Sequence, residues 1–225
     1  AAETDATGKS ILATMIKNID VAEDTDNLLC QDTGIPIYNI TIGRSVEVDG
    51  IDLKTAIRKG CTRATQEYPL RSSVVHPVTR ENEHTSCGRR VPVINVDFSE
   101  ADEELVIEMI PKGSGSENGS FLKMCIPADG VAGIKTFVID KVLEAGGKVC
   151  PPTIVGVGVG GTADLCTKLA KIAAIRPLGS VCGDPEGAKL ELELTDAVNS
   201  LGIGPQGLGG DSTSFAVHVE TAATH

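Results

Sequence analysis

The sequence predicts an α/β fold in which a mixed sheet is flanked by helices, and two patterns lead to this expectation. Short runs rich in Ile and Val alternate along the chain with longer segments whose apolar residues recur at helical spacing. Such alternation is typical of α/β proteins. The 225 residues suffice for one large domain or two small ones. Because no repeat or low-complexity linker divides them, we expect a single domain over 1–225.

The first half of the chain contains three predicted elements. Residues 7–24 place a Thr cap ahead of apolar residues at helical spacing, which predicts a helix that leads into the segment around Cys30. Residues 35–43 alternate as a strand does and end at a glycine. Residues 52–68 have a helical pattern that Pro69 brings to an end.

The second half begins with two predicted strands, 91–98 and 104–111, which an acidic turn joins. A hairpin is their simplest arrangement. Five further elements follow in the order helix, strand, helix, helix and strand, at 129–147, 152–160, 162–175, 184–202 and 215–220. Glycine and proline support these boundaries, because a double glycine closes the first of these helices and Pro185 opens the last one.

The acidic composition restricts the partners of the protein. The formal net charge is -11, whereas nucleic acids and anionic membranes reward clustered Lys and Arg, so neither is an expected partner. No apolar run approaches the roughly 20 residues of a membrane-spanning helix, and no signal segment opens the chain. We therefore expect a soluble, cytoplasmic protein. Since the sequence starts without an initiator Met and stops at His225 with no terminal turn, we also expect truncation at both ends.

Seven cysteines are spread widely through the chain. Their odd number and the lack of a secretory signal argue against a disulfide framework. No C-x-x-C pair occurs, which also argues against a compact zinc knuckle or a thioredoxin-like motif. The interpretation that remains is a mixture of buried core thiols and two or three thiols that bind a metal or cluster from distant loops.

Three segments are dense in glycine and offer flexible backbone with several N–H donors: 111–120, 150–164 and 202–214. The first follows a predicted strand and either binds an anion through these donors or forms a polar turn. The second contains Gly156, Gly158 and Gly161 at the spacing of a dinucleotide fingerprint, although its glycines begin inside the strand. A nucleotide-binding oxidoreductase, with Cys30 and Cys150 as core thiols, is therefore an alternative interpretation.

Four motifs, read together and in order, resemble one family. They are CQDTG at 30–34, KGSGSEN at 112–118, and the segments 146–162 and 202–225. They resemble the α subunit of the two-subunit class I fumarate hydratases, a likeness shared with L-tartrate dehydratase that covers nearly all of the chain. Such enzymes carry a 4Fe-4S cluster held by three protein thiolates, and its fourth iron is open to substrate.

The resemblance implies the ligands of this cluster. Cys30 resembles the first ligand, and Cys150, which precedes two prolines, matches the second. The third ligand of the family follows shortly after the histidine that His225 matches, so we expect it beyond residue 225. The other cysteines match no ligand position and are expected to be structural: Cys61, Cys87, Cys125, Cys166 and Cys182.

The resemblance also implies the residues that act on substrate. Catalytic roles fall to Asp32, which would transfer a proton or orient the group that does, and to His225, which would shuttle a proton or bond a carboxylate. The substrate-binding positions of the family are matched by Gln31, Asp32, Arg71, Gly115, Ser116 and His225. Arg71 would bind a carboxylate through two parallel hydrogen bonds. Read from the residues alone, the alternatives are an Asx-turn cap for Asp32 and a surface role for Arg71, and His218 is expected to be a satisfied strand residue.

These matches predict the α subunit of a fumarate hydratase, which interconverts fumarate and (S)-malate by adding or removing water. The open iron of the 4Fe-4S cluster would act as Lewis acid. L-Tartrate dehydratase and mesaconate hydratase are alternatives, since their substrates differ by a small substituent. The expected partners are a fumarase-type β subunit and a small dicarboxylate, in an α2β2 assembly or an αα dimer. A non-catalytic assembly subunit is a further alternative.

Overall fold

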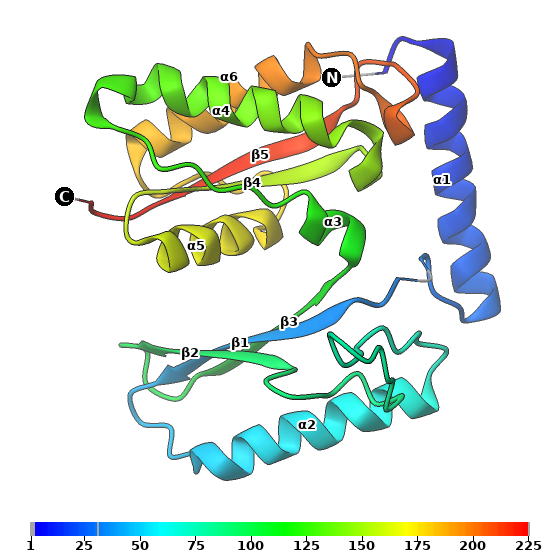
Figure 1. Ribbon diagram of the computed structural model, residues 1–225, viewed down its shortest axis with the longest axis vertical. Helices are drawn as coiled ribbons and strands as arrows, with labels where there is room; N and C mark the ends of the chain where they lie inside the picture. The colour runs from blue at the N-terminus through cyan, green and yellow to red at the C-terminus, as the bar shows by residue number, and fades with distance from the viewer. Residues whose placement is uncertain (1–2, 31, 225) are drawn as a thin grey trace. The chain divides into compact units, whose positions relative to one another are not determined.

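The computed structural model describes residues 3–30 and 32–224, and the chain divides into two compact units (Figure 1). Unit 1 contains Ala1–Lys17 and Asn118–His225, and unit 2 contains Asn18–Glu117. Helix α1, Ala6–Thr25, therefore begins in unit 1 and ends in unit 2. Each unit has a sheet of its own, and the single domain over 1–225 stays a prediction.

Unit 2 is built on a three-stranded mixed sheet in the order β2-β1-β3. The central strand β1, Ile35–Gly43, pairs in parallel with β2, Val93–Ser99, and antiparallel with β3, Leu105–Lys112. The predicted mixed α/β fold is thus confirmed. The predicted hairpin is wrong, because β2 and β3 each pair with β1 instead of with each other. The apolar strand β1 satisfies its backbone on both sides, which outweighs the short connection between β2 and β3.

Helix α2, Gly50–Glu67, makes the crossover from β1 to its parallel neighbour β2. The Asp49 side chain caps this helix by accepting hydrogen bonds from Ile51 N, at 2.8 Å, and from Asp52 N. The helix buries Ile57, Cys61 and Thr65 at helical spacing. It ends before Pro69, as the sequence predicts.

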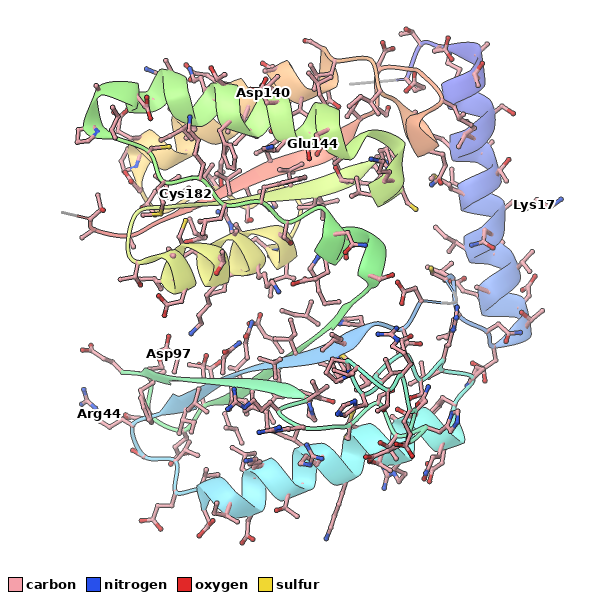
Figure 2. The ribbon with its side chains drawn as sticks, viewed as in Figure 1. Lys17, Arg44, Asp97, Asp140, Glu144 and Cys182 are labelled. Carbon is pink, nitrogen blue, oxygen red and sulfur yellow. The ribbon has the colours of Figure 1, made fainter. Side chains whose placement is uncertain are left out.

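Unit 1 contains a two-stranded parallel sheet of β4, Thr153–Val159, and β5, Ser214–Thr221. Helices α4, Gly130–Ala145, and α6, Pro185–Asn199, cover one face of this sheet, and α5, Ala163–Ile175, covers the other (Figure 1). The core between β5 and the first two helices consists of Val138, Leu190, Leu194, Val198, Val217 and Val219. On the opposite side of α4, Asp140 and Glu144 are exposed (Figure 2).

Short helical turns complete the fold: α3, Ser114–Asn118; η1, Pro127–Asp129; η2, Gly146–Val149; and η3, Pro205–Gly207. Among the described residues, no helix has the length and apolar content that crossing a membrane requires. The helix α1 begins one residue earlier than predicted, and its cap is Asp5 rather than Thr7, because Asp5 Oδ1 accepts a hydrogen bond from Gly8 N at 2.9 Å.

The glycines that match a dinucleotide fingerprint serve strand–helix packing in this structure. Gly156 and Gly158 lie within β4 and face α5. A Cβ atom at Gly156 would overlap the carbonyl oxygen of Ala170, and one at Gly158 would overlap that of Cys166. The two glycines therefore let the helix backbone approach the strand, a close contact that any other residue would prevent.

We expect the substitution Gly158→Ala to lower the free energy of unfolding by about 3 kcal/mol, because the new methyl group has to displace helix backbone. Urea denaturation followed by circular dichroism measures this change. Gly183→Ala is the matched control, since no atom of the described chain lies within 4 Å of its new methyl group. Equal unfolding midpoints for the two variants would contradict the packing role.

Candidate functional site

The loop that contains Cys30 meets the loop after β3 because of the strand pairing in unit 2. Ile35 opens β1 and pairs with Lys112, which closes the antiparallel strand β3, so the segments beyond these two residues start side by side. Gly34 lies at this contact with φ +76°, and a Cβ atom there would overlap the backbone of Lys112 and Gly113. Only glycine fits this left-handed, crowded position. The contact brings Asp32 next to the KGSGSEN motif.

Asp32 caps the short helix α3 from a distance of 82 residues along the chain. Its Oδ2 atom accepts hydrogen bonds from the backbone N of Ser114, at 2.8 Å, and from the Ser114 hydroxyl, at 3.2 Å. A Cβ atom at Gly113 would lie 2.7 Å from the same carboxylate oxygen, so glycine is needed here too. Among the described residues, no hydrogen bond to Oδ1 of Asp32 accompanies these two to Oδ2. The cap joins two loops rather than closing the local Asx turn.

Arg71 is joined to the Cys30 loop through Thr33. The Arg71 backbone N donates a 2.9 Å hydrogen bond to Thr33 Oγ1, and the Arg71 side chain is exposed. A pocket of about 400 Å³ lies here, lined by Asn27, Leu28, Cys30, Pro69 and Arg71. Cys30 and Arg71 therefore line the same pocket, whose volume is large enough for a small dicarboxylate.

Gly115 and Ser116 lie in helix α3, beside the residue that Asp32 caps. Gly115 is half-buried, and the Ser116 hydroxyl is exposed but donates a 3.0 Å hydrogen bond to Gly113 O. The structure thus brings together four of the sequence-predicted site residues in unit 2, besides Cys30: Asp32, Arg71, Gly115 and Ser116. Gln31 and His225 lie outside the described residues.

Cys150 belongs to unit 1 and follows the turn η2 directly. Its side chain is exposed, and its backbone has φ +55°, in the left-handed region. Its N–H donates a 3.2 Å hydrogen bond to Gly147 O, and the next residue, Pro151, is buried and accepts a 2.7 Å hydrogen bond from Gln206 N. The thiol is thus presented at the surface of unit 1 by a turn that is itself held in place.

The cysteines differ in burial, and burial bears on whether a thiol can bind a metal cluster. Burial raises the pKa of the Cys61 thiol to about 11, and it also raises the pKa of Cys166. Thiols of this kind stay protonated and bind metal poorly, since the thiolate is the ligand. Cys30 and Cys150, in contrast, are exposed, so both fit the donor set of an iron-sulfur cluster. No group of three or more acidic, His or Cys side chains within reach of one metal ion occurs in 3–30 and 32–224.

The structural role expected for the other cysteines is supported in part. Cys61, Cys87 and Cys182 are buried, the last of them labelled in Figure 2. Cys166 is half-buried and donates a 3.1 Å hydrogen bond to Gly158 O. Cys125 is exposed, so burial gives no support to a core role for this thiol. Sequence spacing alone offered no signal of that exposure.

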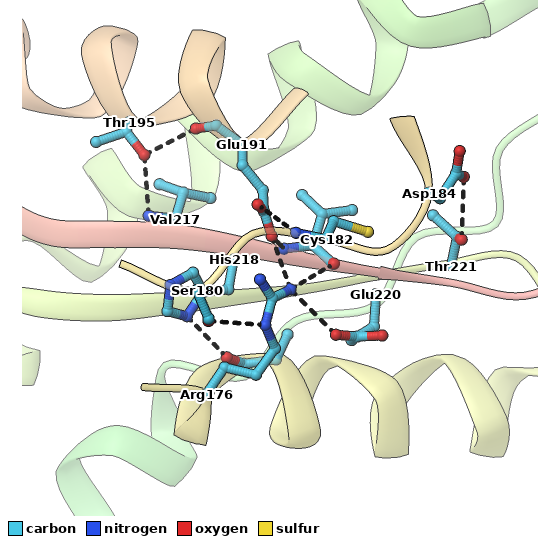
Figure 3. Close-up of polar contacts among 12 residues, drawn as sticks. Arg176, Ser180, Cys182, Asp184, Glu191, Thr195, Val217, His218, Glu220 and Thr221 are labelled. Atoms are coloured by element: carbon cyan, nitrogen blue, oxygen red, sulfur yellow. Dashed lines mark hydrogen bonds and ion pairs between the residues drawn. The ribbon is translucent and has the colours of Figure 1, made fainter. Parts of the chain in front are cut away.

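A partly buried ionic network that the sequence did not reveal anchors strand β5 (Figure 3). Arg176 Nη1 donates to Glu191 Oε1 at 2.8 Å and to Glu220 Oε1 at 3.0 Å. Burial alone would raise the pKa of Glu191, but hydrogen bonds from the N–H groups of Val219 and Cys182, together with Arg176, lower it overall. His218 is buried nearby with Nδ1 3.1 Å from Ala173 O, which confirms it as a satisfied strand residue.

Comparison with known proteins decides the family. The model of the fumarate hydratase (Fumerase) family matches residues 1–225, the whole chain. The chain belongs to the fumarate hydratase family. Among its relatives, the putative L(+)-tartrate dehydratase subunit alpha of Methanocaldococcus jannaschii is 48% identical over 99% of this chain and 79% of the relative. The L(+)-tartrate dehydratase subunit alpha of Escherichia coli strain K12 is 34% identical over 100% of this chain and 74% of the relative.

Membership in this hydro-lyase family confirms the resemblance read from the four sequence motifs. Three of them form the loops described above: CQDTG contains Cys30 and Asp32, KGSGSEN forms the end of β3 with α3, and the third motif carries Cys150. The α-subunit character also agrees with the names of both relatives.

We expect thiol alkylation to separate the cysteines of the metal-free full chain. At pH 8, iodoacetamide should modify the exposed Cys30, Cys125 and Cys150 at least about tenfold faster than Cys61, whose raised pKa of about 11 leaves little thiolate. Peptide mass spectrometry measures the rate at each cysteine. Modification of Cys61 as fast as Cys30 would show that the buried thiol is not held as described.

The variant Glu191→Gln should lower the free energy of unfolding by about 2 kcal/mol, because the buried carboxylate loses its charge-assisted hydrogen bonds while Arg176 keeps the ion pair with Glu220. Since the folded-state pKa of Glu191 is lowered, its contribution is present above the ordinary glutamate pKa and is lost as pH falls through the folded value. The stability gap between wild type and variant should therefore narrow in acid, as urea titrations at several pH values measure. Glu186→Gln, at an exposed position of the same helix, is the control.

Proposed function

We propose that this chain is the cluster-binding α subunit of an iron-sulfur hydro-lyase that adds water to, or removes it from, a small dicarboxylate. The observation that carries the proposal is the pocket of about 400 Å³ lined by both Cys30 and Arg71. A metal-ligating thiol and a carboxylate-binding cation in one pocket are what such a reaction needs. Membership in the fumarate hydratase family supports the same reaction.

Cys30 and Cys150 would hold the 4Fe-4S cluster, together with a third thiolate beyond residue 225. Both thiols are exposed and therefore accessible to iron. When bound, the cluster would supply a Lewis-acidic iron that lowers the pKa of the water or hydroxyl group to be moved. In this proposal residues 1–225 form a single cluster-binding domain, to which Cys30 and Cys150 each contribute one thiolate.

The residues of the chain itself would bind the substrate and move a proton. Arg71 supplies a local cation in an acidic protein and can bind a carboxylate through two parallel hydrogen bonds. Asp32 is fixed through Oδ2 by Ser114, so Oδ1 is available to accept or donate a proton at a defined place. Gly115 and Ser116 would contribute donors to the second carboxylate, for which the Ser116 hydroxyl would turn away from Gly113 O. Substrate binding by Gln31 and a catalytic role for His225 belong to the proposal as well.

Two substrates have specific support. The description of the family model supports fumarate and (S)-malate, which the KGSGSEN loop also favours. The names of two relatives at 48% and 34% identity support L-tartrate. Mesaconate is a third candidate, since the pocket need only admit one methyl group more.

A β subunit is the proposed partner, because both relatives are named as alpha subunits. We propose that the β subunit completes the substrate site, in an α2β2 assembly or around an αα dimer. The chain by itself would then bind iron without turning over substrate.

We expect about four irons for each α chain when the full-length chain is purified anaerobically with its β subunit. Cys30→Ser should lose the iron and the hydration activity together, while Cys125→Ser, at an exposed thiol outside the family motifs, should keep both. Iron and sulfide analysis and a fumarate hydration assay measure these outcomes. An iron-free wild type after reconstitution would refute the proposed function, and nicotinamide binding would then be measured.

The variant Arg71→Lys should separate substrate binding from cluster binding. Lysine keeps the charge but loses the paired donors, so we expect kcat/KM to fall about 100-fold while the iron content is unchanged. Assays with fumarate, L-tartrate and mesaconate on the same preparations rank the three candidates. Unchanged kcat/KM for every substrate would exclude Arg71 from the substrate site.

A further inference from the structure

The carboxylate of Glu3 binds the glycine-rich loop 203–213 of unit 1. Both Oε1 and Oε2 accept a hydrogen bond from the backbone N of Asp211 at 3.0 Å, and Oε2 accepts another from Ser212 N at 2.9 Å. Oε1 also accepts a 3.0 Å hydrogen bond from Asp5 N, next to the start of α1. In return, Asp211 Oδ2 accepts hydrogen bonds from the N and Oγ1 of Thr4. The two segments are thus bound to each other reciprocally.

The space around this carboxylate is closed on two sides. Glu3 is only 9% exposed. A Cβ atom at Gly8 would lie 2.7 Å from Glu3 Cδ, and a Cβ atom at Gly210 would lie 3.0 Å from its oxygens. The backbone N–H of Asp211 is the main reason that the pKa of Glu3 falls to about 2, so the carboxylate is ionised at every ordinary pH. The surrounding backbone thus holds the charged carboxylate of Glu3 in one place.

The same loop packs on its other side against the turn that carries Cys150. Gln206 N donates a 2.7 Å hydrogen bond to Pro151 O. Gly207, at φ +74°, lies so close to Gly147 that a Cβ atom would be 2.5 Å from the Gly147 Cα. The loop therefore lies between the Glu3 carboxylate and the Cys150 turn, and it contacts both.

Cys150 needs such support because its backbone conformation is unfavourable. The left-handed region costs a non-glycine residue roughly 1 to 2 kcal/mol, and it persists where surrounding contacts hold it. The single N–H bond of Cys150 to Gly147 O, at 3.2 Å, is a modest restraint. The packing of the glycine-rich loop on Gly147 and Pro151 supplies further restraint on the backbone of Cys150.

We propose that Glu3 is a positioning residue for Cys150, acting through the glycine-rich loop 203–213. The inference rests on the proposed function only in that Cys150 is taken as a cluster ligand. Glu3 itself touches neither substrate nor cluster in this account. Its carboxylate holds one side of the loop so that the other side keeps the Cys150 turn in its left-handed conformation.

Hydrogen exchange on the metal-free full chain tests whether Glu3 positions Cys150 through this loop, and it requires no measurement of enzyme activity. We compare wild type with Glu3→Gln, which removes the charge, and with Gly8→Ala, which crowds the unaltered carboxylate. Peptides covering 209–213 should exchange about tenfold faster in both variants, and peptides covering 203–208 and 146–151 about threefold faster. Exchange in α5 and α6 should be unchanged. Glu193→Gln, which breaks an exposed ion pair with Lys135, is the control and should alter none of these segments.

Two results would overturn the proposal. Faster exchange confined to 209–213 would mean that Glu3 stabilises only the segment it binds and has no effect on the Cys150 turn. Equally faster exchange in α5 and α6 would mean that Glu3 contributes only to global stability.

A second measurement uses the protein loaded with iron and purified with its β subunit. We expect a chelator to remove iron about threefold faster from Glu3→Gln than from wild type, as the visible absorption of the cluster records. In the Glu3→Asp variant, which keeps the charge, the rate of iron removal should return part of the way to that of wild type. If Glu3→Gln loses iron as slowly as wild type, Glu3 does not position Cys150. If wild type binds no cluster at all, the proposed function fails, whereas the exchange experiment still decides whether Glu3 positions Cys150.

Discussion

The two hydrogen bonds that Asp32 accepts from Ser114 are the contact on which the candidate site of unit 2 depends. They join the loop before β1 to the loop after β3, and the pairing of Ile35 with Lys112 brings those loops together in the first place. Thr33 then ties in the segment of Arg71 by a third hydrogen bond. Side chains from three distant parts of the chain therefore converge. The contacts that bring them together, which are the cap, the hydroxyl hydrogen bond and the strand pairing, all lie within a few residues of each other at 32–35.

The two exposed thiols are presented in different ways. Cys30 lines a pocket next to a cation, whereas Cys150 is itself in the left-handed region and ends the turn η2, whose Gly147 packs against Gly207. Unit 1 adds an ionic network around Arg176 that anchors β5 to α6. Both cysteines are exposed, in segments that hydrogen bonds to neighbouring parts of the chain hold in place.

Local patterns predicted the elements well but not their pairing. The strand at 35–43 and the helix beginning at Pro185 follow directly from alternation, proline and glycine. The hairpin was wrong because β1 pairs with both neighbours, a preference that no short stretch of sequence encodes. The cap of α3 by Asp32 and the anchoring of the glycine-rich loop by Glu3 join residues 82 or more positions apart. The motifs located Cys30 and Arg71 through family likeness, and the shared pocket came from the fold.

The order of the segments around the pocket has a consequence for how the protein is made. Cys30 and Arg71 leave the ribosome before β3, yet the cap that joins their loops to α3 requires Ser114. The central strand β1 must also wait for β2 and β3 before either of its edges is covered. A nascent chain shorter than this leaves the edges of β1 unpaired, a state prone to aggregation. The loop that carries Cys30 is therefore expected to reach its folded arrangement only after Ser114 has left the ribosome.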